Sequence, residues 1–409
     1  MKSGRARREP DLALAEAVSL AAALPGLDIV GAEVVRLAKA QPGLLFGTGK
    51  VAELKERFAE AEVGLVLVDG PVTPVQQRNL EKEWGVKLLD RTGLILEIFA
   101  DRARTREGVL QVELAALSYQ RTRLVRAWTH LERQRGGFGF VGGPGETQIE
   151  ADRRAIDEEV VKIRRQLGKV VKTRELHRAA RRKVPFPVVA LVGYTNAGKS
   201  TLFNRMTGAE VLAKDMLFAT LDPTMRGVTL PAGRKVILSD TVGFISDLPT
   251  QLVAAFRATL EEVLEADLIL HVRDIAHPET EEQAADVADI LDSLGVDDDV
   301  PMFEVWNKID LLSEDTRRAL MVQDARTPGI HAVSAITGEG LPALLDAISQ
   351  VLDEERSDEV LVLPHTAGKA RAWLHRQGVV QAETDTDQGQ RLTVRWTARQ
   401  KAAFAALEP

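Results

Sequence analysis

The eight residues 193–200, GYTNAGKS, constrain the fold of this chain more than any other segment, because they match G-x-x-x-x-G-K-S in full. They follow an apolar, β-branched run, VVALV at 188–192, and they precede TLFNRM at 201–206, which can open a helix. A strand, a glycine-rich turn and a helix N-terminus together direct backbone N–H groups at anionic oxygens. The segment therefore predicts a phosphate-binding loop in an α/β sheet.

Several positions of this loop have an expected role. Gly193 and Gly198 allow the tight turn, Lys199 reaches the β and γ phosphates, and Ser200 offers a hydroxyl to magnesium. A chance match in a glycine-rich turn is the alternative, and the flanking strand and helix disfavour it. The predicted nucleotide-binding residues of this segment are Gly193, Tyr194, Thr195, Asn196, Ala197, Gly198, Lys199, Ser200 and Thr201.

Composition narrows the class of protein. A chain of 409 residues with 45% apolar residues suggests several globular domains, and the absence of cysteine excludes disulfides and thiolate metal sites. No run of about eighteen apolar residues is present, so we expect no membrane span and a cytoplasmic protein. The net charge of −7 disfavours nucleic acid as a partner of the whole chain, yet residues 101–183 contain 20 Lys or Arg against 11 Asp or Glu, a balance of +9. This basic segment is typical of a surface that faces a polyanion.

Residues 27–103 alternate strand-like and helix-like runs, which predicts a small α/β layer with a parallel sheet. The expected strands are 29–37, 64–68 and 86–89, and the expected helices are 50–61 and 75–84. The region contains GTGK at 47–50, but Leu44 stands where a phosphate loop has its first glycine and Val51 stands where it has Ser or Thr. This segment therefore predicts a turn that enters a helix, and not a second nucleotide site.

The basic segment has two series of apolar residues at heptad spacing, separated by a glycine-rich break at 135–145. The first series is Leu110, Leu114, Leu117, Leu124, Trp128 and Leu131, with Arg121 as the polar step. The second series begins in the segment 147–150, which fits a capping box, and is Ile149, Ile156, Val160, Ile163, Leu167 and Val170. This pattern predicts an antiparallel helical hairpin with arms of roughly 40 Å and a glycine-rich tip.

The tip has the composition of an RNA-binding loop. Arg133 and Arg135 can bind phosphate, Gly136 lets the backbone approach closely, and Phe138 and Phe140 can stack on unpaired bases. A structural spacer with a solvated charged face is the alternative reading of the hairpin.

The predicted fold class is α/β, with a doubly wound P-loop sheet between smaller units. We expect an N-terminal α/β domain at 1–105, the helical hairpin at 106–183, the doubly wound sheet at 184–353 and a small α+β domain at 354–409. The basic residues 181–183 and Pro185 mark the boundary between the hairpin and the doubly wound sheet. The last unit should contain strands at 360–363, 379–382 and 392–396, and helices at 370–376 and up to Leu407.

Two further segments complete a predicted triphosphate site. A strand at 236–239 delivers Asp240, Thr241, Val242 and Gly243; Asp240 can hold magnesium through water and the Gly243 amide can contact the γ phosphate. The second segment is Phe218, Ala219, Thr220, Leu221 and Asp222. Thr220 is the expected second magnesium hydroxyl and Thr224 is the alternative. The predicted metal ligands are thus Ser200, Thr220 and Asp240.

The segments after two later strands predict the base. Asn307, Lys308, Ile309 and Asp310 follow a strand at 302–306, and a carboxylate at Asp310 can accept both guanine N–H groups, whereas adenine would leave it unpaired. Asn307 can bond the other purine edge and Lys308 can pack along the base. Ser334 and Ala335 end another strand, where the Ala335 amide can reach the guanine oxygen. The predicted ligands are GTP and GDP.

These motifs resemble the translation-factor-related class of P-loop GTPases. The segments GGPGETQIEADRR, LFATLDPT and DTVGF, with the α/β domain and hairpin before them, further resemble the HflX family of ribosome-associated GTPases over residues 29–352. The resemblance implies binding to the large ribosomal subunit and its RNA, and splitting of stalled or idle ribosomes, with the hairpin tip near the peptidyl transferase centre. We expect a monomer. Asn196 resembles the asparagine that holds potassium in some related GTPases, and it can equally cap the loop.

The expected reaction is attack of water on the γ phosphate, with Lys199, Thr220 and Gly243 as catalytic residues. Many GTPases have glutamine after D-x-x-G, but this chain has Phe244, which cannot orient water. We therefore predict slow intrinsic turnover that ribosomes accelerate. A tRNA-modifying GTPase is one alternative, disfavoured because those proteins use a C-terminal cysteine, and a GTP-gated RNA-binding assembly factor is another.

Overall fold

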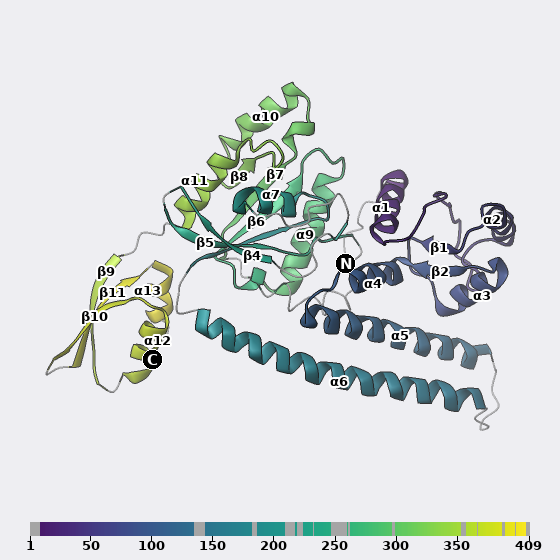
Figure 1. Ribbon diagram of the computed structural model, residues 1–409, viewed down its shortest axis with the longest axis horizontal. Helices are drawn as coiled ribbons and strands as arrows, with labels where there is room; N and C mark the ends of the chain where they lie inside the picture. Colours follow the sequence, from purple (N-terminus) through teal and green to yellow (C-terminus); the bar gives the residue numbers. More distant parts are fainter. Residues whose placement is uncertain are drawn as a thin grey trace.

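The computed structural model describes residues 9–134, 144–181, 186–208, 217–218, 224–231, 233–246, 260, 262–296, 299–352, 357–365, 367–386, 389–396 and 398–405 (Figure 1). The side chains at 124–134, 144–149, 171–181, 398–399 and 403 are outside this description.

The N-terminal region is a small α/β layer. Its elements are α1 (Pro10–Ala23), α2 (Thr48–Glu60), β1 (Leu65–Val68), α3 (Pro74–Trp84), β2 (Lys87–Asp90) and α4 (Arg91–Arg102). The strands β1 and β2 pair in parallel, as predicted. Helix α2 begins directly after Gly47, so the GTGK segment enters a helix and the sequence prediction is confirmed.

The strand predicted at 29–37 is wrong. Within the described residues this segment pairs with no strand, and its apolar side chains, such as Val30 and Val34, are exposed. Residues with β-branched side chains favour a strand only where a neighbouring strand and a covered face stabilise it. The segment has no neighbouring strand among the described residues, and most of its large apolar side chains are exposed although Val35 packs partly against the core of the layer, so its composition does not produce the predicted element.

The basic segment folds into the predicted hairpin. Its helices α5 (Arg106–Gln134) and α6 (Pro144–Arg181) run antiparallel along one another, beneath the N-terminal layer and the central sheet in Figure 1. Val160 and Ile163 are buried at the seam, and Arg121 Nε forms an ion pair with Asp157 Oδ1 at 2.7 Å. Helix α6 begins at Pro144, so the predicted start at 147–150 is wrong. Proline is favoured in a first helical turn because its fixed φ suits the helix and its missing N–H costs nothing there.

The central unit is a six-stranded sheet covered by helices on both faces. In the order β4-β5-β3-β6-β7-β8, the strands are β4 (Thr224–Thr229), β5 (Lys235–Asp240), β3 (Val188–Gly193), β6 (Leu268–Asp274), β7 (Met302–Asn307) and β8 (Ile330–Ala332). All neighbours pair in parallel except β4, which is antiparallel to β5. Its main helices are α7 (Lys199–Thr207), α9 (Thr280–Leu294), α10 (Glu314–Asp324) and α11 (Leu341–Leu352). This confirms the doubly wound fold and brings the carboxyl ends of the parallel strands to one edge.

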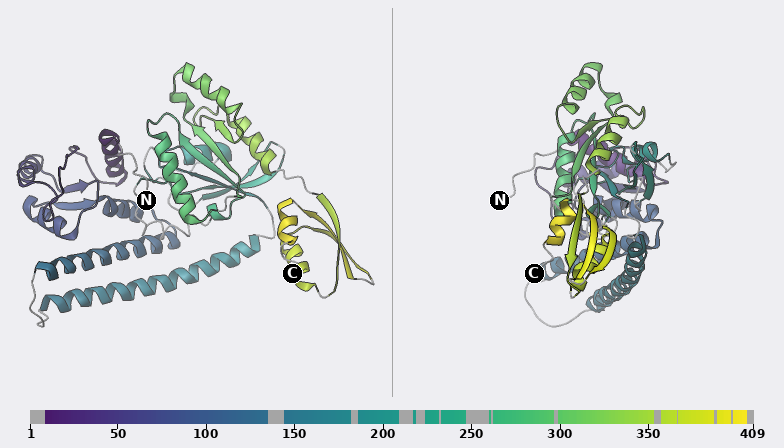
Figure 2. Two further views of the ribbon diagram at one scale, coloured as in Figure 1. Left: turned by 180° about the vertical axis from the view of Figure 1, so that it is seen from behind. Right: turned by 90° about the vertical axis from the view of Figure 1, so that its left-hand side faces the viewer.

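The C-terminal region has a separate core. The antiparallel sheet β10-β11-β9 consists of β9 (Ser357–Leu363), β10 (Val380–Thr386) and β11 (Gly389–Trp396), with α12 (Gly368–Arg376) and α13 (Ala398–Ala405) against it. Leu374, Val394 and Trp396 are buried with Phe404 of α13. The left view in Figure 2 shows this unit at the opposite end of the molecule from the N-terminal layer. The predicted α+β unit is therefore present, and the exact four-part division stays a prediction.

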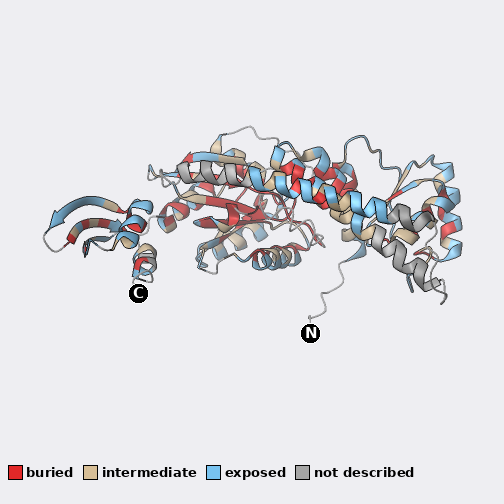
Figure 3. Ribbon diagram, turned by 90° about the horizontal axis from the view of Figure 1, so that it is seen from below, coloured by how far each residue is buried: buried red, intermediate tan, exposed pale blue. Residues whose placement is uncertain are grey.

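The N-terminal layer and the central sheet share one apolar core. Ile95, Ile98 and Phe99 of α4 belong to the same buried cluster as Phe218 and Phe244. The rings of Phe99 and Phe218 meet edge to face, with centroids 4.6 Å apart. Figure 3 shows buried residues concentrated in the central sheet. Among the described residues, no helix is long and apolar enough to cross a membrane.

Candidate nucleotide-binding site

The segment 193–200 leaves β3 and enters α7 through a turn that only glycine allows at two positions. Gly193 has φ +152°, and a Cβ there would lie 2.2 Å from the carbonyl oxygen of Val272 on β6. Gly198 has φ +94°, and a Cβ there would lie 2.2 Å from Asn307 Nδ2. The sheet therefore packs directly against the loop, which holds the loop backbone in place before any ligand binds.

Lys199 lies inside this loop. Its side chain is buried, and Nζ donates to the carbonyl oxygens of Gly193 at 3.1 Å and Tyr194 at 2.8 Å. Burial lowers the pKa of Lys199 to about 8, and nearby Asp240 opposes this shift. A phosphate beside Nζ would stabilise the charged form further. The structure thus places the predicted phosphate-binding cation where the loop wraps around it.

Ser200 and Asp240 meet at the start of α7. Ser200 Oγ donates to Asp240 Oδ2 at 2.7 Å, and Asp240 is fully buried at the end of β5. A hydroxyl and a carboxylate are hard oxygen ligands of the type that magnesium takes beside phosphates, with waters completing its shell. The two residues therefore fit the predicted role. No group of three or more potential metal-binding His, Cys, Asp or Glu residues is found in the described part of the chain.

The segment after β5 is joined to the phosphate loop by backbone hydrogen bonds. Phe244 N–H donates to Gly193 O at 3.1 Å, and Thr195 N–H donates to Phe244 O at 2.7 Å. Gly243 lies between them: a Cβ there would come within 2.9 Å of Thr195 Cα and 3.0 Å of Lys199 Nζ. Thr241 is buried and its hydroxyl donates to Leu191 O at 2.6 Å, and Val242 is buried too. The structure thus brings 240–244 onto the loop, as the sequence predicts.

Phe244 faces the shared core and not the phosphate loop's solvent side. It is 1% exposed and belongs to the cluster formed with α4. Its side chain therefore lies among apolar groups, where it could not orient a water molecule even if it were polar.

Only the first residue of the second predicted segment lies in the described part. Phe218 is buried against Phe99 and has φ +56°. Ala219, Thr220, Leu221 and Asp222 lie outside the described residues. Thr224, the alternative magnesium hydroxyl, begins β4 opposite Asp240.

Asn307 braces the loops of the site. It is 2% exposed; its Nδ2 donates to Ala197 O at 2.8 Å, and its Oδ1 accepts from Ala335 N–H at 3.0 Å. One side chain thus ties the phosphate loop to the segment after β8. In this arrangement the Ala335 amide is used by Asn307, and the predicted contacts of Asn307 and Ala335 with guanine stay predictions.

The remaining base-side residues lie beside this brace. Lys308 has φ +67° and its Nζ donates to Asp274 Oδ2 at 2.7 Å, which holds its stem along this edge. Ile309 is buried, and Asp310 lies half-buried in the short helix Ile309–Leu311. Ser334 is buried, and its Oγ accepts from Thr337 N–H at 3.1 Å. The structure thus brings together the predicted base-binding segments at the carboxyl edge of β7 and β8.

Asn196 is exposed at the turn of the loop and has φ +59°. Asparagine adopts this left-handed conformation more readily than most residues. Its presence therefore has a conformational explanation, and the predicted potassium contact stays a prediction. Thr201 continues the first turn of α7.

Three residues near Tyr194 were not predicted from the sequence, namely Glu16, Arg91 and Ser246. The Tyr194 hydroxyl donates to Glu16 Oε2 at 2.6 Å and accepts from Ser246 N–H at 2.8 Å, and Arg91 donates to Glu16 and to Ser246 O. Glu16 belongs to α1 and Arg91 to α4, at distances along the chain that no motif spans. No pattern in the sequence could have placed them at the phosphate loop.

The predicted RNA-binding residues are not tested by the structure. Arg133 lies within the bounds of α5, but its side chain is outside the described part. Arg135, Gly136, Phe138 and Phe140 also lie outside the described residues.

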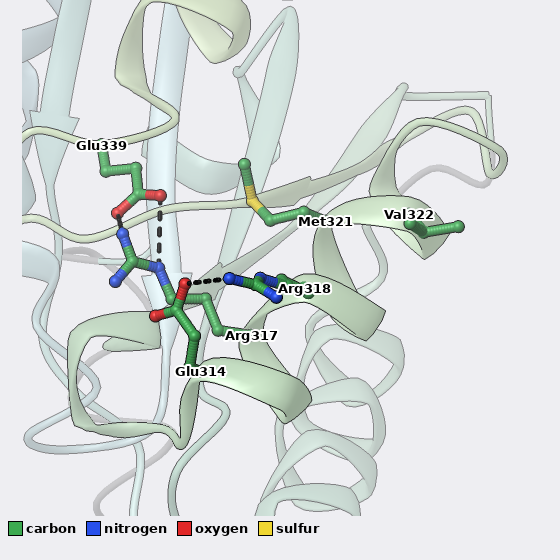
Figure 4. A pocket seen from close by; sticks show the side chains of 6 residues that line it. All are labelled: Glu314, Arg317, Arg318, Met321, Val322 and Glu339. Atoms are coloured by element: carbon green, nitrogen blue, oxygen red, sulfur yellow. Dashed lines mark hydrogen bonds and ion pairs between the residues drawn. The ribbon is translucent and has the colours of Figure 1, made fainter.

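A surface hollow of about 430 Å³ lies on α10 (Figure 4). Arg317 Nε donates across it to Glu339 Oε1 at 3.2 Å. Its lining residues are Glu314, Arg317, Arg318, Met321, Val322 and Glu339, none of which is a predicted nucleotide ligand. The hollow therefore does not coincide with the predicted nucleotide site, and it borders the base side, where Ser334 N–H donates to Glu339 O at 3.0 Å.

Four family models match consecutive parts of the chain. They are described as GTP-binding GTPase N-terminal (residues 11–100), GTP-binding GTPase Middle Region (102–181), 50S ribosome-binding GTPase (188–308) and HflX C-terminal domain (319–406). GTPase HflX of Magnetococcus marinus is 51% identical to the chain over 335 residues, which are 82% of this chain and 77% of the relative. The chain belongs to the HflX family of GTPases.

Two other HflX relatives agree with this assignment. GTPase HflX of Escherichia coli is 48% identical over 74% of this chain and 70% of its own length, and that of Akkermansia muciniphila is 38% identical over 89% and 85%. A solved complex of the protein SsGBP with GDP is 25% identical, with a TM-score of 0.47, over 82% of this chain and 94% of that chain. The HflX assignment makes the chain a GTP-binding protein and a GTPase, and it confirms the predicted family.

Proposed function

We propose that this HflX GTPase binds the large ribosomal subunit and its RNA and, in its GTP-bound form, splits stalled or idle ribosomes in the cytoplasm. One observation carries the proposal: residues 188–308, which contain the phosphate loop, the segment 240–244 and Asn307, match the family model of a 50S ribosome-binding GTPase. The basic hairpin supports it, because 20 Lys or Arg in residues 101–183 favour contact with the RNA phosphates of a ribosome. We further propose that the protein acts as a monomer.

We propose that magnesium accompanies the nucleotide. Ser200 would hold the ion directly and Asp240 through water, with Thr220 as the predicted second hydroxyl. The bound ion would neutralise charge on the phosphates. Potassium at Asn196 is a finer proposal, and it predicts faster turnover in potassium than in sodium buffer.

The hydrolytic step follows from the residues around the loop. Lys199 would stabilise the negative charge that develops on the γ phosphate. The Gly243 amide would donate to the same phosphate, because residues 240–244 lie against the phosphate loop. No side chain at 244 orients the attacking water, because Phe244 is buried in the shared core. We therefore propose that intrinsic hydrolysis is slow and that the ribosome accelerates it by ordering the segments around the γ phosphate.

The test is ribosome splitting with purified components. Light scattering of intact ribosomes should fall when the protein is added with GTP or a non-hydrolysable analogue, and it should not fall with GDP. Lys199→Ala, which removes the phosphate-binding cation, should abolish the effect. An RNA-binding assembly factor would instead bind ribosome precursors and leave mature ribosomes intact, and that result would refute the splitting proposal.

A further inference from the structure

A series of buried polar contacts joins the hairpin to the phosphate loop through two consecutive residues, Asp90 and Arg91. Asp90 ends β2 and Arg91 begins α4. Their side chains are only 6% and 10% exposed. The two side chains bind different neighbours: Asp90 binds the hairpin, and Arg91 binds the nucleotide site.

On the hairpin side, Asp90 accepts two hydrogen bonds from α5. The Tyr119 hydroxyl donates to Oδ1 at 2.5 Å, and Arg123 Nη1 donates to Oδ2 at 3.0 Å. Asp90 Oδ1 also accepts from Gly93 N–H at 2.8 Å and so caps α4. Arg123 lies over the Tyr119 ring, 5.0 Å from its centroid, and bonds Gln77 of α3. A displacement of α5 would therefore disturb the first turn of α4.

On the nucleotide side, Arg91 joins three segments. It donates to Asp69 at 2.6 Å, to Glu16, and to the backbone oxygen of Ser246 at 3.1 Å. Glu16 in turn accepts from the Tyr194 hydroxyl at 2.6 Å and from Ser246 Oγ at 3.0 Å. The Tyr194 carbonyl accepts from Lys199. Arg91 is thus linked through Glu16 to Tyr194, whose carbonyl oxygen binds Lys199.

The burial of these charges makes the group respond as one unit. Burial opposes the charged form of Arg91, and the carboxylates of Asp69 and Glu16 outweigh it and raise the pKa of Arg91. Moving one member away would leave another buried charge without compensation, which is strongly unfavourable. The contacts therefore shift together or not at all, as a coupling element requires.

We propose that Asp90 and Arg91 are positioning residues that couple α5 of the hairpin to the phosphate loop and to the segment 241–246. Displacement of the hairpin then alters nucleotide affinity, and by thermodynamic reciprocity the bound nucleotide alters the hairpin. The proposal rests on the proposed function only in naming the ribosome as the partner that displaces the hairpin. The effect of the bound nucleotide on the hairpin can be measured without ribosomes.

The chain's tyrosines provide the measurement. It has 2 tyrosines, and they are Tyr119 and Tyr194, at opposite ends of the contacts. Labelling the full chain with 3-fluorotyrosine gives one ¹⁹F signal at each end, assigned with Tyr119→Phe and Tyr194→Phe. Replacing GDP with a non-hydrolysable GTP analogue should shift the Tyr194 signal and also the Tyr119 signal. A Tyr119 signal that does not respond would overturn the coupling.

Two matched substitutions on α4 test the path. Arg91→Lys keeps the charge but loses the forked geometry that reaches Glu16, Asp69 and Ser246 together. It should remove most of the Tyr119 shift and change the GDP dissociation rate roughly 2- to 30-fold, the range of typical coupling networks. Arg102→Lys is the control, because Arg102 is in the same helix but donates to Ala23 O at 3.0 Å. Equal Tyr119 shifts in the two variants would contradict the proposal.

A second variant keeps the proposal testable if Arg91→Lys misfolds, which circular dichroism would detect. Asp90→Asn keeps an α4 cap but removes the charge that Arg123 binds. It should also weaken the Tyr119 response, while a full response would refute the role of Asp90. If ribosomes are not split but Tyr119 responds to nucleotide, the proposed function fails and the coupling stands. If ribosomes are split but the Tyr119 signal does not respond to nucleotide, the coupling is refuted and the proposed function stands.

Discussion

The two sides of the nucleotide site are built differently. The base side, around Asn307 and Ala335, is held by contacts within the central unit: Asn307 bonds both Ala197 and Ala335. The phosphate side, around Tyr194 and the segment 241–246, is closed by Glu16 and Arg91 from the N-terminal layer. From this difference we expect base recognition to depend on the central unit alone, and the proposed response to the γ phosphate to depend also on the N-terminal layer.

The largest loss of nucleotide affinity should come from Gly198, where the phosphate loop contacts Asn307 of the base side. Gly198→Ala would place a Cβ 2.2 Å from Asn307 Nδ2 at φ +94°, so the loop and the brace could not both keep their positions. We expect GDP and GTP binding to weaken at least roughly a hundredfold, measured by calorimetry. Gly208→Ala is the control, because Gly208 has φ +66° but its Cβ would meet nothing within 4 Å. Equal losses would show that backbone strain, and not the contact with Asn307, is responsible.

A base-side substitution should change specificity without changing the phosphate side. Asp310→Asn removes the carboxylate predicted to accept two guanine N–H groups, so the preference for GDP over ADP should fall by roughly ten- to a hundredfold in competition assays. The nucleotide-dependent Tyr119 signal should persist at saturating nucleotide. Loss of that signal would mean that the two sides are not independent.

A smaller effect should appear with pH on the phosphate side. The pKa of Lys199 is lowered to about 8, and a bound phosphate should raise it. Below about pH 8 the lysine is already charged, so binding takes up no proton; above it, binding must take up a proton and affinity should fall as pH rises. Calorimetry in buffers of different ionisation enthalpy should show uptake near pH 9 but not near pH 7. Asp310→Asn should keep this uptake, since it leaves Lys199 in place.

The smallest effect on nucleotide affinity should come from the hairpin tip. Replacing residues 136–145 with a short flexible linker should leave GTP binding unchanged, because the described site contains none of these residues. Stimulation of turnover by large subunits should be lost. A tip variant that is still fully stimulated would remove the hairpin from the proposed ribosome response and leave the central unit as its only source.

Much of the fold could be predicted from local pattern. Heptad spacing predicted α5 and α6, and apolar runs before polar loops predicted the strands β3, β5 and β7. The failures have physical reasons. The run at 29–37 has strand composition but no neighbouring strand among the described residues, and α6 starts at Pro144 and not at the capping box.

The candidate site divides in the same way. The motif residues Lys199, Ser200 and Asp240 meet as predicted, because their spacing along the chain follows the strand-helix order of the sheet. The part played by Asn307 as a brace was not predicted, because both of its partners lie on other loops.

The sequence by itself determined the phosphate loop, the base-side motif and the hairpin, because each is specified by residues close together in the chain. Only the tertiary structure decided that Phe244 is buried in a shared core and that Tyr194 bonds Glu16, 178 residues away. Contacts at such separation depend on how α1 and α4 pack against the sheet, which leaves no periodicity or spacing in the sequence. The loop that binds phosphate can thus be recognised from eight residues, while the contacts that connect it to the hairpin exist only in the folded chain.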